Sequence, residues 1–279
     1  MYRGRFAPSP TGPLHLGSLV AALGSFLDAR SQKGEWRLRI DDIDPPRHDT
    51  ASFRSIPLCL ESHGLTWDGP IIFQSQRREA HEHALSTLRS GGHLFDCLCT
   101  RATLGELGAC VSHCRDRKDI EGSVRFHVPN DAPDRINDLF LGEQRASARP
   151  SNFIVKRRDG LIAYQLATAI DDLDEGYTHV IRGADLLESS LRQMIIHQAL
   201  GHLSPEYGHL PIVTDQSGNK LSKQTGAQAI DTDTPNTNLR RALAFLGQPT
   251  PPEDMDCIDD LLHHATANWR HDALNLRNL

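Results

Sequence analysis

The sequence has no run of about 18 apolar residues, which is the length that a membrane-spanning helix needs. Its first residues, MYRGRFAPSPTG, lack the apolar core of a signal peptide. Positive charge is not in excess either, because 36 Asp and Glu outnumber 30 Lys and Arg, for a formal net charge of −6. These absences argue against a membrane protein and against one that coats nucleic acid by bulk electrostatics. We expect a cytoplasmic globular protein, monomeric by default. A local basic groove for nucleic acid stays open, although short basic clusters on an acidic surface are more often simply solvated.

Cysteine is scarce and unevenly placed, with six residues in all and four of them between positions 97 and 114. Their pattern, C-L-C-x10-C-x3-C, suits a tetrahedral Zn²⁺ site with four protein ligands. Free or redox-active thiols are the alternative, because disulfides are disfavoured in the cytoplasm. We predict one structural Zn²⁺ per chain, with His113 as a substitute ligand. The predicted ligands are Cys97, Cys99, Cys110 and Cys114.

Strand and helix patterns alternate along most of the chain. Residues 2–7 carry a strand pattern, and residues 16–30 carry the apolar periodicity of a helix. This alternation continues to about residue 90 and resumes near Phe153, which is typical of a parallel α/β sheet. We expect a nucleotide-binding domain split by an insert. The predicted segments are 1–90 for its first half, 91–150 for a zinc-containing insert, 151–225 for its second half, and 226–279 for a helical C-terminal appendix.

Two segments far apart in the sequence carry candidate phosphate-binding chemistry. In RFAPSPTGPLHLGS, a strand ends in a Pro- and Gly-rich turn, and His15 and Gly17 lie where the next helix begins. Helix N-termini at the carboxyl edge of a parallel sheet bind phosphates. The second segment is the cationic loop from Lys220 to Lys223. Taken alone, a single histidine is more often structural, and such a loop is usually a solvated turn.

Together, these two segments resemble the HIGH and KMSKS signatures of class I aminoacyl-tRNA synthetases. The resemblance is closest to the glutamyl branch, whose opening R-F-A-P-S-P-T-G stands intact at residues 5–12. RIDDIDPPR at 39–47, LIAYQLATAIDD at 161–172 and VIRGADLL at 180–187 are also similar and occur in the order of that family. The resemblance implies an α/β fold: a Rossmann-type catalytic domain with a small zinc-binding insert and a short helical C-terminal appendix.

The resemblance also implies the activation of glutamate by ATP, with Mg²⁺ accompanying the nucleotide. The amino acid's carboxylate attacks the α-phosphorus and pyrophosphate leaves, a reaction that depends on positioning and positive charge. The catalytic residues implied are His15, Lys220 and Lys223. The ATP-binding residues implied are His15, Gly17, Ser18 and Lys223.

A glutamate pocket needs cations for its carboxylates and an anion for its α-ammonium. The residue that we expect to pair with the side-chain carboxylate is Arg5, because a guanidinium binds a carboxylate bidentately. Its alternative role is a structural salt bridge to Asp41, Asp42 or Asp44. By resemblance, Asp41 contacts the α-ammonium; relatives usually have Glu here, so the shorter side chain favours a water-mediated contact. The remaining glutamate-binding positions implied are Phe6, Ala7, Pro8, Ser9, Tyr164 and Arg182.

The length of chain after the second motif bears on the acceptor. Residues 225–279 are too few for the large helical domain with which a full glutamyl-tRNA synthetase reads the anticodon. A short family with this layout and a zinc cluster, the glutamyl-queuosine tRNA(Asp) synthetases, often has Tyr where this sequence has Cys110. Its members transfer activated glutamate to the queuosine base of tRNA(Asp). The resemblance therefore implies L-glutamate, ATP and queuosine-bearing tRNA(Asp) as partners.

Three other functions stay open. The first is a minimal glutamyl-tRNA synthetase that charges a tRNA 3′ end. The second is a catalytically inactive RNA-binding paralogue, against which the intact Arg5, His15 and Lys223 argue. The third is an unrelated nucleotidylyltransferase of the same fold, against which Tyr164, Arg182 and the R-F-A-P-S-P-T-G block argue.

Overall fold

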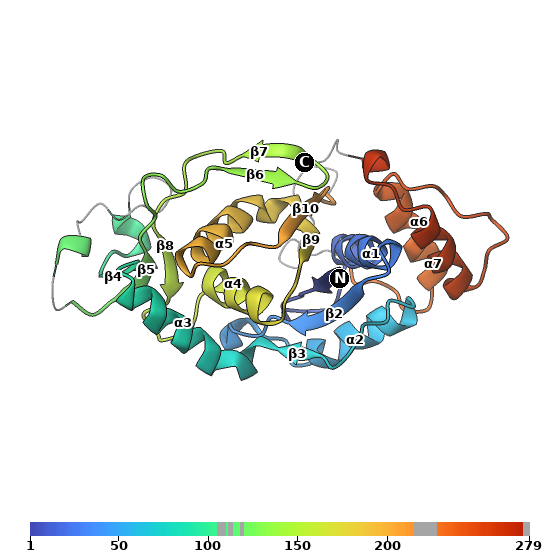
Figure 1. Ribbon diagram of the computed structural model, residues 1–279. Coiled ribbons are helices and arrows are strands. Elements are labelled where there is room, and N and C mark those ends of the chain that lie inside the picture. Colours follow the sequence, from blue (N-terminus) through green and yellow to red (C-terminus); the bar gives the residue numbers. More distant parts are fainter. Residues whose placement is uncertain (105–109, 111–113, 118–119, 215–227, 276–279) are drawn as a thin grey trace.

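A parallel sheet runs through the middle of the protein, shown in Figure 1 as a computed structural model. The structure describes residues 1–104, 110, 114–117, 120–214 and 228–275. Its first strands alternate with helices, as expected: β1 (Arg3–Phe6), α1 (Leu16–Ser31), β2 (Glu35–Ile40), α2 (Ser52–Ser62), β3 (Ile72–Phe73) and α3 (Arg78–Ser90). β1 pairs in parallel with β2, and β2 pairs in parallel with β3.

The other half of the sheet comes from a later part of the chain. Its elements are α4 (Tyr164–Asp174), β9 (His179–Gly183), α5 (Leu187–Ala199) and β10 (Glu206–Leu210). β9 pairs in parallel with β10, and just before β9 the backbone N–H of Thr178 donates to the carbonyl of Arg3 at 2.9 Å. The strands therefore lie in the order β3-β2-β1-β9-β10, and the two halves meet between β1 and β9. The α/β fold predicted from the sequence is confirmed.

Residues 91–150, which we expected as an insert, contribute to two different sheets. β4 (Leu94–Cys97), β5 (Ser123–Phe126) and β8 (Phe153–Lys156) form an antiparallel sheet of their own. β6 (Arg135–Asp138) and β7 (Gly142–Arg145) form a hairpin along the upper side of Figure 1. Through β6 this hairpin pairs in parallel with β10. It thereby extends the central sheet and covers an edge that would otherwise expose unpaired backbone groups.

The helix after the first motif, α1, is buried around most of its circumference. The sheet covers one side, and α6 (Pro235–Phe245) and α7 (Ile258–Ala267) lie on the other (Figure 1). Leu23, Leu27 and other apolar side chains of α1 are fully buried in the main core. Gly24 allows α1 to approach β10 closely, because a Cβ there would lie 2.5 Å from Cδ1 of Leu210. This packing fixes the position of the N-terminus of α1.

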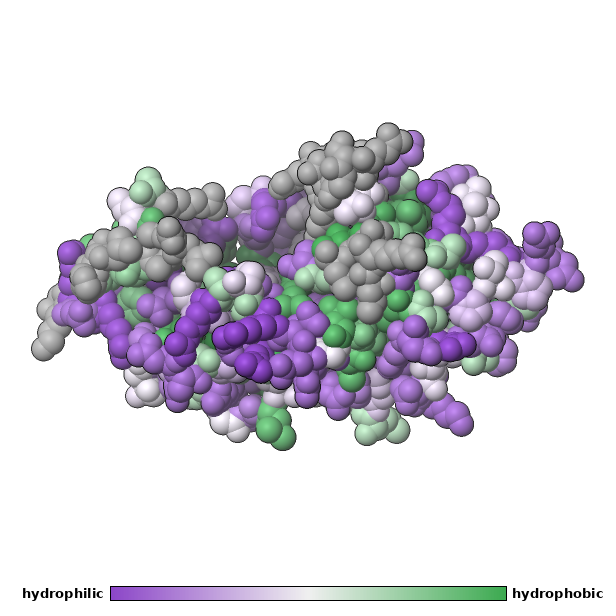
Figure 2. Space-filling view, turned by 90° about the horizontal axis from the view of Figure 1, so that it is seen from above, coloured by the Kyte–Doolittle hydropathy of each residue, from purple (hydrophilic) through white to green (hydrophobic). Residues whose placement is uncertain are grey.

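Hydrophilic residues cover most of the face seen in Figure 2, and apolar residues reach that face mainly in its middle. The large apolar side chains exposed among the described residues are Met1, Leu58, Leu98 and Leu203. Scattered residues of this kind are ordinary on protein surfaces. No helix in the described ranges has both the length and the apolar character needed to cross a bilayer.

The buried carboxylate of Asp28, on α1, joins the beginning of the described chain to its end. It accepts hydrogen bonds from the Tyr2 hydroxyl at 2.5 Å, the Trp269 indole N–H at 3.0 Å and Nε2 of His271 at 2.6 Å. Burial by itself would raise the pKa of Asp28, but these three donors hold it below its usual value. Asp28 therefore stays ionised in the interior and ties the C-terminal segment to α1.

We predict that Asp28→Ala lowers the free energy of unfolding by about 3 kcal/mol, because the Tyr2 hydroxyl and the Trp269 N–H lose their buried acceptor. Denaturant titration followed by tryptophan fluorescence measures the change. The control is Asp272→Ala, which removes an exposed ion-pair partner of Arg270 and should leave the unfolding midpoint unchanged. Equal midpoints for both variants would show that Asp28 does not tie the C-terminal segment.

Candidate active site

A cavity of about 470 Å³ opens at the carboxyl ends of β1, β9 and β10, beside the N-terminus of α1. Small-ligand sites have this size, and parallel α/β sheets bind ligands at this edge. Most residues predicted from the sequence line the cavity: Arg5, Phe6, Ala7, Pro8, Ser9, His15, Gly17, Ser18, Tyr164 and Arg182. The fold thus brings three distant sequence blocks together. Of the remaining predictions, Lys220, Lys223 and the substitute zinc ligand His113 lie outside the described residues.

His15 caps the helix that points at the cavity. It precedes the first residue of α1 in an extended conformation, and its Nδ1 accepts a hydrogen bond from the backbone N–H of Ser18 at 3.3 Å. A neutral imidazole that accepts at Nδ1 carries its proton on Nε2, where it can donate to a phosphate oxygen. Gly17 lies directly against this ring, because a Cβ there would be 3.1 Å from Cε1 of His15. The glycine therefore leaves room for the imidazole.

Arg5 is almost fully buried, and its charge is already balanced within the protein. Its Nε and Nη2 donate to the two carboxylate oxygens of Asp172, on α4, at 3.2 and 3.1 Å. The structural alternative for Arg5 was a salt bridge to one of the aspartates after β2, and the observed partner is none of them. Burial alone would raise the pKa of Asp172, but Arg5 and Arg39 together hold it far below its usual value.

Arg39 and Asp172 are residues of this site that our sequence analysis missed. Arg39 donates to Asp172 at 2.6 Å through Nη1 and to Asp41 at 2.7 Å through Nε, and none of its surface is exposed. Both residues lie inside sequence blocks that we had recognised, RIDDIDPPR and LIAYQLATAIDD. The available signal was a charged residue within an otherwise buried segment, because buried charges in proteins are usually paired.

Arg182, on β9, is also buried but has only neutral partners in the described part of the chain. Its Nη2 donates to Ser190 Oγ at 2.7 Å and to Gln193 Oε1 at 2.8 Å, and its Nη1 donates to the Tyr164 hydroxyl at 3.4 Å. The described residues place no carboxylate within salt-bridge distance of this guanidinium, and its buried Nε has no hydrogen-bond partner among them. A buried cation without a counter-ion is costly, so the cavity favours an anionic ligand at this position.

Asp41 does not line the main cavity. It borders an adjoining cavity of about 180 Å³, which shares Ser9 and Tyr164 with the main one. Burial raises the pKa of Asp41 to about 6, although the ion pair with Arg39 acts in the opposite direction. Asp41 therefore changes its charge close to neutral pH.

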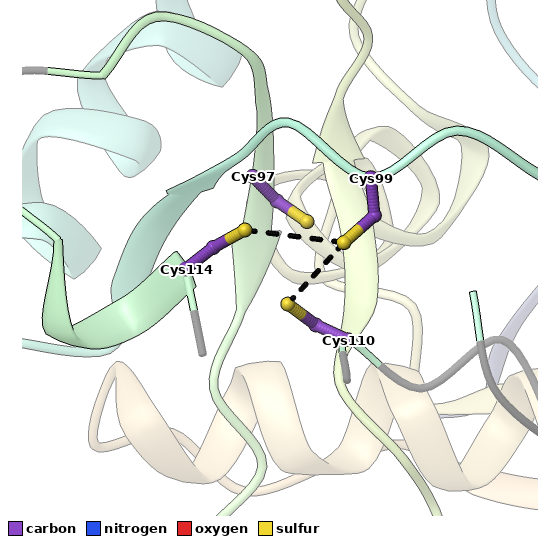
Figure 3. A group of neighbouring side chains, drawn as sticks. All are labelled: Cys97, Cys99, Cys110 and Cys114. Carbon is purple, nitrogen blue, oxygen red and sulfur yellow. Dashed lines mark hydrogen bonds between the residues drawn. The ribbon is translucent and has the colours of Figure 1, made fainter. Parts of the chain in front are cut away.

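The four clustered cysteines converge, as Figure 3 shows. Cys97 ends β4, Cys114 begins a 3-10 helix, and all four sulfur atoms lie within 4.8 Å of one another. The Sγ atom of Cys99 is 3.7 Å from that of Cys110 and 3.9 Å from that of Cys114. Tetrahedral Zn²⁺ with Zn–S bonds of about 2.3 Å places its sulfur ligands about 3.8 Å apart. The spacing therefore fits zinc and is far too long for a disulfide.

Comparisons with known proteins agree with one another. A family model described as "tRNA synthetases class I (E and Q), catalytic domain" matches residues 1–112 and 109–261. The glutamyl-Q tRNA(Asp) synthetase of Yersinia pseudotuberculosis serotype I (strain IP32953) is 44% identical over 274 residues, which cover 96% of this chain and 82% of that protein. The protein of the same name from Vibrio vulnificus (strain CMCP6) is 41% identical over 277 residues, which cover 98% and 91%.

Solved structures share the fold at lower sequence identity. A glutamate tRNA ligase from Elizabethkingia meningosepticum CCUG26117 aligns with a TM-score of 0.78 at 24% identity, over 99% of this chain and 66% of that one. A Mycobacterium tuberculosis methionyl-tRNA synthetase aligns with a TM-score of 0.58 at 12% identity, over 90% and 64%. The α/β core is therefore shared with synthetases named for different amino acids.

Proposed function

Because the chain belongs to the class I tRNA synthetases of the E and Q type, we propose that it activates L-glutamate with ATP and transfers it to the queuosine base of tRNA(Asp). The observation that carries this proposal is the meeting of Arg5, Arg182 and the N-terminus of α1 in one cavity. That arrangement offers cations to an acidic amino acid and a helix terminus to phosphates. The enzyme is a ligase that charges tRNA with glutamate, and queuosine is the acceptor that we propose.

The two arginines take different parts in the proposed glutamate complex. Arg182, which has no counter-ion among the described residues, supplies its charge to a substrate carboxylate next to the Tyr164 hydroxyl. Arg5 uses its Nε and Nη2 for Asp172, so its contact with the side-chain carboxylate runs through Nη1. The α-ammonium pairs with Asp41, which borders the adjoining cavity, and the shorter side chain makes this contact through water. Phe6, Ala7, Pro8 and Ser9 form the adjacent wall.

In the activation step, glutamate and ATP react beside the N-terminus of α1. An oxygen of the α-carboxylate attacks the α-phosphorus of ATP, the bond to pyrophosphate breaks, and glutamyl-adenylate forms. We propose that His15 donates from Nε2 to the phosphates, beside the backbone at Gly17 and Ser18. Lys220 and Lys223 would add positive charge as pyrophosphate leaves, and Mg²⁺ accompanies ATP. The acceptor then attacks the carbonyl carbon of the adenylate, and AMP leaves.

The choice of acceptor rests on the curated relatives. Those named glutamyl-Q tRNA(Asp) synthetase align with 96% or more of this chain, and the alignment covers most of their own length. The second candidate is transfer to a tRNA 3′ end, which the likeness to a glutamate tRNA ligase favours. The two acceptors differ chemically, so one assay separates them.

We also propose that Cys97, Cys99, Cys110 and Cys114 hold one structural Zn²⁺. Four thiolate ligands close the coordination sphere and leave no position for a substrate, which is typical of structural sites. The ion would join the end of β4 to the 3-10 helix Cys114–Asp116 and so brace the segment between β4 and β5.

The acceptor is tested with radiolabelled glutamate, ATP and Mg²⁺, offered with queuosine-bearing tRNA(Asp), the same tRNA without queuosine, or tRNA(Glu). We expect label only on the first. Label on tRNA(Glu) alone would replace the queuosine proposal with 3′-end charging. Absence of both labelled tRNA and glutamate-dependent pyrophosphate exchange would reject the ligase itself.

Zinc content tests the cysteine cluster. We expect about one zinc per chain by elemental analysis of protein purified under reducing conditions, and its loss in Cys110→Ser, because three thiolates leave the tetrahedral site open. Cys257→Ser is the control, since Cys257 is exposed and lies outside the cluster. Metal-free protein whose four clustered thiols all react freely would show that the cluster is not a zinc site.

The raised pKa of Asp41 predicts how glutamate binding depends on pH. We expect the KM for glutamate to rise as pH falls through about 6, because a protonated Asp41 no longer attracts the α-ammonium. Asp41→Asn should raise the KM about 10- to 100-fold at pH 7.5 and abolish this acid limb. Asp42→Asn is the control, because Asp42 pairs with Ser75.

Acid unfolding caused by protonation of Asp41 cannot explain such a rise in KM at low pH. Its pKa is higher in the folded protein than the ordinary value of 3.8, so proton uptake between these values favours the folded state. Its contribution to stability therefore grows as pH falls through about 6.

If the KM for glutamate still rises at low pH in Asp41→Asn, another group causes that rise and the proposed contact is wrong.

A further inference from the structure

A chain of buried polar side chains leads from the β6–β7 hairpin to the cavity. Oδ2 of Asp138, at the end of β6, lies 2.5 Å from Nδ1 of His209 on β10. Nε2 of His209 lies 2.9 Å from Oγ of Ser190 on α5, and that Oγ accepts from Nη2 of Arg182 at 2.7 Å. Each of the four side chains is at most 5% exposed. The chain thus connects four separate elements without passing through solvent.

The carboxylate at the far end of this chain is held ionised. Its other oxygen, Oδ1, accepts the backbone N–H groups of Phe140 and Leu141 at 3.0 Å each and that of His209 at 3.2 Å. Burial alone would raise the pKa of Asp138, but the hydrogen bond to His209 and these amides lower it. Oδ2 can therefore only accept, and the hydrogen between Asp138 and His209 belongs to Nδ1 of the imidazole.

This arrangement orients the serine hydroxyl. Burial lowers the pKa of His209, and the nearby Arg182 acts in the same direction although Asp138 opposes it, so the ring is neutral. With its proton on Nδ1, the ring accepts at Nε2 from the hydroxyl of Ser190. Among the described residues, the other acceptor within reach of that hydroxyl is the carbonyl of Leu186, which is farther away at 3.2 Å. The lone pairs of Ser190 then face Arg182.

A neutral acceptor suits Arg182 better than a carboxylate would. Arg5 is held by Asp172 directly, and its charge is cancelled there. Arg182 is held by Ser190 and Gln193 instead, so its position is fixed while its charge stays available to an anionic ligand. The negative charge of Asp138 is kept two side chains away from the guanidinium.

The hairpin that supplies Asp138 sits tightly on the strand that supplies His209. Asp138 is the register partner of Tyr207 on β10. A Cβ at Gly208 would come within 2.7 Å of the ring of Phe140, so only glycine lets the hairpin approach this closely. The carboxylate is therefore rigidly placed with respect to the imidazole.

We propose that Asp138, His209 and Ser190 are positioning residues that hold the guanidinium of Arg182 against the carboxylate of the amino-acid substrate. The β6–β7 hairpin thereby takes part in glutamate recognition, although it lies outside the motifs that form the cavity. This inference rests on the proposed function, in which Arg182 binds glutamate.

Ser190→Ala tests the last link of the chain. In glutamate-dependent pyrophosphate exchange, we expect the KM for glutamate to rise about 10-fold, because Arg182 loses an acceptor for a charged N–H group. The kcat and the KM for ATP should change less than about twofold, since the chain reaches only the amino-acid side of the cavity. Saturating glutamate should therefore restore the rate.

The matched control is Ser25→Ala. Ser25 is equally buried, accepts from the Trp36 indole at 3.0 Å and donates to the carbonyl of Ala22, so its loss also removes buried hydrogen bonds. We expect it to lower thermal stability as Ser190→Ala does, without changing the KM for glutamate. An equal rise in KM for both variants would mean that general destabilisation, and not positioning, is responsible.

His209→Asn tests whether His209 acts on Arg182 through its hydrogen bond to Ser190. The shorter amide can still donate to Asp138 but no longer reaches Ser190, so the KM for glutamate should rise about threefold or more. In the Ser190→Ala background the same change should add less than about twofold, because the link is already broken. The proposal would be overturned if the KM change of the double variant equalled the product of the two single changes. It would also be overturned if Ser190→Ala left the KM for glutamate unchanged.

The same assays separate this inference from the function on which it rests. Wild-type enzyme that exchanges pyrophosphate with glutamate while Ser190→Ala behaves identically would reject only the positioning chain. Wild-type enzyme that shows neither glutamate-dependent exchange nor labelled tRNA would reject the proposed function, and the positioning proposal with it.

Discussion

The carboxylate of Asp172 lies between two guanidinium groups, and the architecture of the cavity depends on this interaction. Asp172 binds Arg5 from β1 through both oxygens and Arg39 from β2 through one, while Arg39 also binds Asp41. All four side chains are buried, and their charges sum to zero. Removing one partner would leave an unpaired charge in the interior, a change that typically costs several kcal/mol. The network therefore fixes α4 against the ends of the first two strands, where the cavity opens.

This network explains why two arginines in one cavity differ in character. The positive charge of Arg5 is balanced by Asp172, whereas Arg182 meets a serine, a glutamine and a tyrosine among the described residues. Arg5 thus stabilises the scaffold as well as lining the cavity, and Arg182 is the guanidinium that we propose for binding the ligand's negative charge. A preformed site of this kind is oriented before its substrate arrives, which is how positioning contributes to catalysis.

Local sequence patterns identified many residues of this site. They did not identify contacts between residues that are distant in the sequence. The R-F-A-P-S-P-T-G block, the helix start at His15 and the spacing of the four cysteines could all be read locally. The partner of Arg5 could not, because Asp172 is distant in sequence and three nearer aspartates were equally plausible on charge alone. Asp41 was assigned to the glutamate pocket, yet it borders the neighbouring cavity, since its side chain turns toward Arg39.

The amino-acid sequence by itself determined the α/β class, the alternation of strands and helices, and the residue types that we propose for binding phosphate, carboxylate and zinc. These result from local periodicity, from turn residues and from motifs whose members lie close together along the chain. Only the tertiary structure decided that the β6–β7 hairpin joins β10, that Asp138 meets His209, and that Arg182 is left without a carboxylate among the described residues. The reason is physical: ion pairing and burial depend on distances between elements, which packing sets and a one-dimensional pattern does not record.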